Sequence, residues 1–204
     1  MNIFFIGDEL VAGRGDPKAL GWTGRVAART ISDGLDPSFC TLAVAGETTA
    51  EMAQRWDEEV MRRVHTREPN VVVFGIGRHD IRRKVSRAKT RLYLATTLDQ
   101  TLDLGFHPVL IGPPPSIPSE NDAVSELALV CEEAAARRDV TYVDTYGPLA
   151  AHEQWLTDIE AGADGLPGQA GYGLMAWLVL HAGWRTWMAE IAAGPSAPAD
   201  EPSV

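Results

Sequence analysis

The sequence predicts a single α/β domain with a parallel sheet covered by helices on both faces. Short β-rich runs alternate with longer amphipathic stretches along the chain, which is typical of that fold class. The 204 residues suffice for one well-cored domain and are too few for two ordinary ones. A composition of 45% hydrophobic and 23% charged residues is that of a globular protein. We therefore expect the loops that follow the strands to share one edge of the sheet.

The strands are expected near residues 3–6, 39–44, 71–76, 108–111 and 140–143. Helices are expected near residues 22–32, 48–64, 86–104, 120–138 and 170–191. In the last of these, apolar residues from Tyr172 to Trp187 recur at steps of three and four, which is core spacing. The domain is predicted to span residues 1–192. The tail 193–204, rich in Pro, Ala and Ser, is predicted to be disordered.

Charge and composition limit the partners. A net charge of −10 argues against binding to nucleic acid or to anionic membranes, because the protein's field repels polyanions. No stretch approaches the roughly 18 apolar residues of a membrane span. The apolar start "IFFI" lacks a basic flank, so it predicts a core strand rather than a signal peptide. Cys40 and Cys131 fit no metal or redox motif and are expected to be free thiols. These features predict a cytoplasmic protein acting on a small molecule. They leave its oligomeric state open.

The first strand stops at a turn that carries two acids. In "IFFIGDELVAG" the apolar run ends at Gly7, and Asp8 and Glu9 follow directly. Parallel α/β folds place their chemistry at such strand-to-loop junctions. Three further loops carry "AGETT" (45–49), "GRHD" (77–80) and "DGLPGQAGY" (164–172).

Taken together and in this order, the four blocks resemble those of the SGNH/GDSL hydrolases, a family of esterases, lipases and thioesterases. The resemblance covers nearly the whole chain and implies a single three-layer flavodoxin-like domain with a five-stranded sheet in the strand order 2-1-3-4-5. It also implies that Gly46 supplies a backbone N–H of the oxyanion hole. Asp8 would be a structural hydrogen-bonder of the turn.

Three residues that define the family are replaced. Glu9 stands where the family has its nucleophilic Ser, and His79 stands where it has the oxyanion-hole Asn, with Asp80 retained. The last block normally reads Asp-x-x-His before Pro, but here Asp164 reaches Pro167 without a His. An acyl-transfer site needs a nucleophile, a base and oxyanion donors. The sequence therefore argues against ordinary serine esterase activity and against any serine nucleophile.

These residues are compatible with three alternative functions. In the first, Glu9 is a general acid/base for cyclisation, dehydration, isomerisation or water-activating hydrolysis, with its pKa raised by a buried setting and a second acid. His79 would be a hydrogen-bond donor or second acid/base, and Asp164 a polar wall residue. In the second, the protein is a catalytically inactive pseudoenzyme that binds a small molecule or a protein. In the third, relocated residues such as His152 or Ser116 restore ester hydrolysis.

Neighbouring residues complete the predicted pocket. Arg78 directly precedes His79 and is expected to pair with Glu9 or with a ligand anion. Asp8, Gly46 and Asp80 are the other predicted substrate contacts. We expect no cofactor and no metal, because the candidate acids and His79 lack a close ligand spacing such as His-x-x-x-His.

Overall fold

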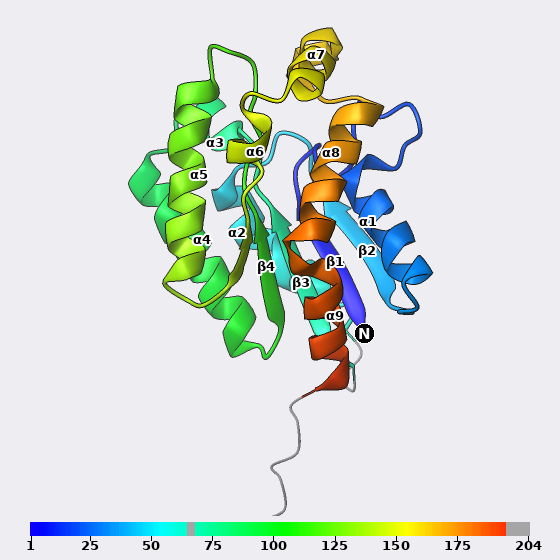
Figure 1. Cartoon of the computed structure of the whole chain (residues 1–204). Helices are drawn as coiled ribbons and strands as arrows, with labels where there is room; N and C mark the ends of the chain where they lie inside the picture. The colour runs from blue at the N-terminus through cyan, green and yellow to red at the C-terminus, as the bar shows by residue number, and fades with distance from the viewer. Residues whose placement is uncertain (65–67, 195–204) are drawn as a thin grey trace, which may run out of the picture.

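The computed structural model describes residues 1–64 and 68–194 (Figure 1). Five strands form one parallel sheet in the order β2-β1-β3-β4-β5, which confirms the predicted strand order. The strands are β1 (Asn2–Gly7), β2 (Ser38–Ala43), β3 (Asn70–Gly75), β4 (His107–Ile111) and β5 (Thr141–Val143). Each overlaps the segment in which it was expected.

The helices flank the sheet on both faces (Figure 1). They are α1 (Gly21–Ser32), α2 (Thr49–Met61), α3 (His79–Arg82), α4 (Arg87–Asp103), α5 (Asn121–Ala136), α6 (Tyr146–Leu149), α7 (Glu153–Ala161), α8 (Gln169–Val179) and α9 (Arg185–Ala193). Side chains of α1, α7, α8 and α9 pack in one core, and side chains of α2, α4 and α5 pack in the other. The protein is therefore a three-layer α/β domain, as predicted.

Strands β1 and β3 are buried along their whole length, and between their first Asn and last Gly they are apolar, because both of their faces are covered. In β1, Ile3 and Phe5 join the core beneath α1 and α8, whereas Phe4 and Ile6 join the core beneath α2 and α4. The ring of Phe5 packs edge-on against Trp22, with centroids 5.4 Å apart, and stacks on Trp184 at 6.3 Å. This packing fixes β1, whose last residue leads into the acidic turn.

The expected helix over residues 170–191 is interrupted. Between α8 and α9 the chain forms a π-helical turn, Leu180–Trp184, in which Gly183 adopts φ 123°. The ring of Trp187 lies so close that a Cβ on Gly183 would be 2.9 Å from it. Periodicity of apolar residues alone did not reveal this break, because the apolar face continues across it.

The segment between β5 and α8 was expected to be a loop and is instead helical. It holds α6, α7 and a 3-10 turn, Ala163–Gly165, and Trp155 of α7 is fully buried. His152 lies exposed directly before α7. Most of the predicted tail, residues 195–204, lies outside the described residues. Among residues 1–64 and 68–194, no helix has the length and apolar character needed to cross a bilayer.

We predict that Phe5→Ala lowers the free energy of unfolding by about 3–5 kcal/mol, because it removes a ring that packs against two tryptophans in a closed core. Equilibrium unfolding in urea measures this loss. The matched control is Leu92→Ala, whose side chain is 61% exposed and whose loss should change stability by less than about 0.5 kcal/mol. Equal effects of the two substitutions would contradict the packing described here.

Candidate active site

The loops after β1, β2 and β3 meet at one edge of the sheet. Gly7, the last residue of β1, is level with Ala43 of β2 on one side and with Gly75 of β3 on the other. Because the strands are parallel, the residues that follow them are brought together. These loops carry Glu9, Gly46 and His79, so the fold unites three of the residues that the sequence singled out.

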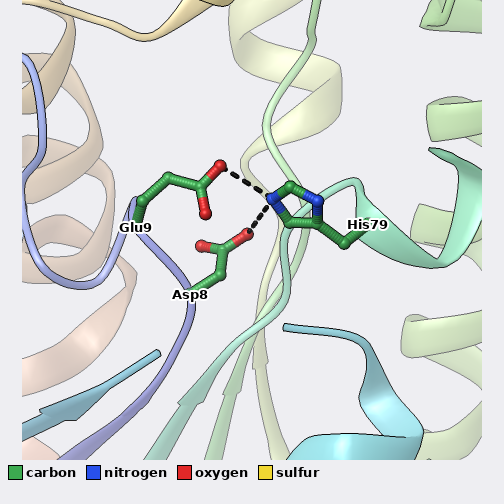
Figure 2. A group of neighbouring side chains, drawn as sticks. All are labelled: Asp8, Glu9 and His79. Atoms are coloured by element: carbon green, nitrogen blue, oxygen red, sulfur yellow. Dashed lines mark hydrogen bonds and ion pairs between the residues drawn. The ribbon is translucent and has the colours of Figure 1, made fainter. Parts of the chain in front are cut away.

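Glu9 is held by the backbone N–H of Gly46 and by the imidazole of His79. Its Oε2 accepts a hydrogen bond of 2.8 Å from the backbone N–H of Gly46. Its Oε1 lies 2.7 Å from Nε2 of His79 (Figure 2). The side chains of Glu9 and His79 are only 6% and 11% exposed. The carboxylate of Glu9 thus engages both groups that the sequence resemblance predicts for an oxyanion hole.

Gly46 presents its N–H through a backbone conformation that favours glycine. Its φ is 79°, in the left-handed region. The next turn begins α2, where Thr48 and Glu51 form a reciprocal capping box. This cap fixes the loop, so the Gly46 N–H stays directed at Glu9.

Asp8 belongs to the turn and also faces the site. Its Oδ1 accepts a hydrogen bond of 2.9 Å from the N–H of Leu10, which supports the structural role expected for it. Its Oδ2 is buried without a hydrogen-bond partner and lies 3.7 Å from Nε2 of His79 (Figure 2). The absence of a side chain at Gly77 makes room for it, because a Cβ there would lie 1.8 Å from Oδ2.

The pKa values of the two adjacent acids, Asp8 and Glu9, are shifted in opposite directions. Burial, reinforced by the charge of Glu9, raises the pKa of Asp8 to about 7. Burial also opposes ionisation of Glu9, but the hydrogen bonds from His79 and Gly46 outweigh it and lower the pKa of Glu9 to about 2. The hydrogen bond to Glu9 raises the pKa of His79 against the effect of burial. The expectation of a raised pKa at Glu9 is therefore wrong, and the raised pKa belongs to Asp8.

Asp80 ties three helices together. Its Oδ1 accepts the N–H of Thr49 at 2.8 Å, and its Oδ2 accepts the hydroxyls of Thr49, at 2.6 Å, and of Thr90. The carboxylate is 4% exposed. It joins α3 to the start of α2 and of α4, and its predicted contact with a substrate stays a prediction.

Arg78 does not pair with Glu9, because its guanidinium is directed at the loops before α5 and α8. It donates to Oγ of Ser116 at 2.7 Å and to the backbone carbonyl of Asp164, and its Nη1 lies 3.7 Å from Glu120. Ser116 in turn donates to Glu120 at 2.6 Å. Ser116 is thus a buried member of an ion-pair network.

Asp164 lies apart from the Glu9–His79 pair. Its side chain is 63% exposed and accepts hydrogen bonds from Nη1 and Nη2 of Arg82 at 2.7 and 3.0 Å. It lines a cleft of about 460 Å³ that also includes Arg14, which follows the acidic turn. Leu166, which lies in the fourth sequence block directly before Pro167, is buried and lines the same cleft. The sequence analysis gave no role to Arg14, Arg82 or Leu166.

Among residues 1–64 and 68–194, one group of side chains is placed to hold a metal ion: Asp8, Glu9 and His79. Their three nearest donor atoms lie within 4.8 Å of one another. The expectation of no metal rested on spacing along the chain, and the fold brings together residues that are 70 positions apart.

The comparisons with known proteins agree with this fold. Residues 5–174 match the model of the GDSL-like lipase/acylhydrolase family. A lipase/acylhydrolase from Enterococcus faecalis is similar in structure, with a TM-score of 0.72 and 24% identity over 89% of this chain and 94% of that one. An acetylxylan esterase from Geobacillus stearothermophilus has a TM-score of 0.72 and 21% identity over 89% and 93% of the two chains. No curated protein matched the chain.

The chain belongs to the GDSL-like lipase/acylhydrolase family, because the family model covers most of its length. Its fold is that of a hydrolase.

We predict that stability falls as pH rises from about 4.5 to 7, with a slope of up to about 1.4 kcal/mol per pH unit. The native state keeps a proton on Asp8 up to a pKa of about 7, whereas the unfolded chain releases it near 3.8, so the native state binds more protons in this window. Glu9, with its pKa lowered to about 2, loses its contribution only below about 4.5.

Urea unfolding of wild type and Asp8→Asn in buffer containing a chelator, at several pH values, tests this sign. The slope should be shallower in the variant. A wild-type protein that becomes steadily more stable from pH 4.5 to 7 would show that Asp8 titrates normally.

Proposed function

We propose that this chain is a small-molecule enzyme on the hydrolase fold that works by proton transfer at the Glu9–His79 pair, without a serine nucleophile. The observation that carries the proposal is the 2.7 Å contact between His79 Nε2 and Glu9 Oε1 at the strand ends where this fold places its chemistry. The reactions open to such a pair are hydrolysis by an activated water, dehydration, cyclisation and isomerisation.

The pair, rather than Glu9 alone, is the working unit. A carboxylate with a pKa of about 2 is a weak base at neutral pH. It is well suited to hold the imidazole in place and to stabilise its protonated form, as the carboxylate of a catalytic triad does. His79 is then the group that gives and takes the proton, and its Nδ1 is the ring nitrogen not engaged by Glu9 (Figure 2). Asp8, whose pKa is raised to about 7, carries a proton that exchanges near neutral pH.

A cleft lined by Arg14 and Asp164, and by neither Glu9 nor His79, supports a small-molecule substrate. Its volume of about 460 Å³ lies in the range of ligand sites. Arg14 in its wall is joined to the acidic turn, because its N–H donates to the carbonyl of Glu9 at 2.9 Å. The cleft also offers the guanidinium of Arg14 and the carboxylate of Asp164 as polar contacts.

A second candidate, the inactive pseudoenzyme, is favoured by a different observation. Glu9 fills the donors of the oxyanion hole, and the side chains of the pair are nearly closed to solvent. A site of this kind would bind a ligand in the neighbouring cleft and leave it unchanged. The substitution described next separates the two candidates.

We predict that Glu9→Gln lowers turnover of the true substrate at least about 100-fold while binding persists, because the variant keeps the shape of the side chain but cannot stabilise a protonated His79. A thermal-shift screen of small esters, lactones and carboxylates, with product analysis of each hit, identifies the compound. Asp99→Asn, an exposed carboxylate paired with Arg138, is the control and should keep wild-type turnover. A compound that binds wild type and Glu9→Gln alike and survives intact would favour the pseudoenzyme.

We also predict that a fluorophosphonate probe forms no covalent adduct with the wild-type protein, because the family's nucleophile is replaced by Glu9 and Ser116 is buried and hydrogen-bonded. Intact-mass measurement after treatment checks this, with an active serine esterase of the same family treated in parallel. An adduct located at Ser116 would instead support the hypothesis that relocated residues carry out ester hydrolysis.

A further inference from the structure

We propose that Asp8, Glu9 and His79 form a binding site for one divalent transition-metal ion, with zinc as the best-matched ion. The ligand atoms are Asp8 Oδ2, Glu9 Oε1 and His79 Nε2 (Figure 2). The proposal does not rest on the proton-transfer function, since a bound ion would serve an enzyme or a pseudoenzyme equally.

The spacing of the three atoms suits a small cation. Ligand atoms at 2.0–2.1 Å from a tetrahedral zinc ion lie roughly 3.3 Å apart. Here Nε2 of His79 is 2.7 Å from Glu9 Oε1 and 3.7 Å from Asp8 Oδ2. These two distances lie on either side of the required value, and all three atoms lie within 4.8 Å of one another, so binding an ion would require the two carboxylates to draw together around it.

The independent observation is the oxygen of Asp8 that has no hydrogen-bond partner. Asp8 is 2% exposed, and its Oδ2 is buried without a donor. A buried carboxylate oxygen left in this state is costly. It cannot turn away easily, because Oδ1 is fixed by the N–H of Leu10 and Oδ2 lies against Gly77. Oδ2 is therefore held facing the imidazole, where a cation between them would satisfy it.

The charges of Asp8, Glu9 and His79 favour binding of a cation. Two carboxylates share a single imidazole there. The nearby guanidinium of Arg78 is engaged instead by Ser116, Asp164 and Glu120. A divalent ion would supply the positive charge that the two acids lack.

The donor set indicates which kind of ion fits. One imidazole nitrogen with two carboxylate oxygens suits zinc and neighbouring divalent transition metals, and three protein ligands leave a fourth position open. The second oxygen of Glu9 accepts the N–H of Gly46, and the second oxygen of Asp8 accepts the N–H of Leu10. Such backbone contacts orient the ligands of metal sites.

Calorimetric titration of chelator-treated wild-type protein with Zn²⁺, and with Co²⁺ followed by its absorption spectrum, tests the site directly. We expect one ion per chain and a Co²⁺ spectrum typical of four-coordinate geometry. His79→Gln and Glu9→Gln should each weaken the affinity by at least about tenfold. Asp8→Asn should do the same, and the first two variants carry the test if this one does not fold, as judged by circular dichroism.

Asp99→Asn is the matched control, because it removes one surface carboxylate and changes the net charge as Asp8→Asn does. It should bind Zn²⁺ as wild type does, which separates the site from weak binding to an acidic surface. The proposal is overturned if wild type shows no saturable site, or if folded His79→Gln binds Zn²⁺ as tightly as wild type. Because the readout is binding, either result is obtained independently of any turnover.

Discussion

The candidate site depends on the hydrogen bond between His79 and Glu9. The carboxylate of Glu9 would be a costly buried charge without it. The imidazole at 2.7 Å and the Gly46 N–H at 2.8 Å satisfy both oxygens of Glu9 and outweigh the burial that opposes its ionisation. Glu9 and His79 are therefore complementary. Removing either partner would leave the other buried without its counterpart.

The backbone around this bond is shaped by glycines, each for a separate reason. Gly46 provides a left-handed φ of 79° that aims its N–H at Glu9. Gly77 provides room, since any side chain there would strike Asp8. At the end of β1 a Cβ on Gly7 would lie 2.3 Å from the carbonyl oxygen of Gly75. Together these positions let two acids and an imidazole approach within a few ångströms at the edge of a packed sheet.

The segment around Asp164, where the family resemblance places the base, is held by ion pairs. Arg78 and Arg82 bind Asp164 and Glu120, so the loops before α5 and α8 are tied to α3. Leu166 is buried directly before Pro167. The N–H of Gly46 and the imidazole of His79 are both engaged by Glu9. A polar, ionisable cluster is therefore present at the strand ends, next to loops that ion pairs fix.

The sequence by itself determined where the strands lie along the chain and which residues follow them at the carboxyl edge of a parallel sheet. Its resemblance to a known family added the strand order, the three-layer architecture and the meeting of Glu9, Gly46 and His79. It did not determine the helices α6 and α7 or the break at Gly183, where local contacts override apolar periodicity. Nor did it determine the direction of the pKa shifts or the partners of Arg78. Those depend on which hydrogen bonds and charges surround each buried group. Only the tertiary structure decides that, because residues 9, 46 and 79 are distant along the chain.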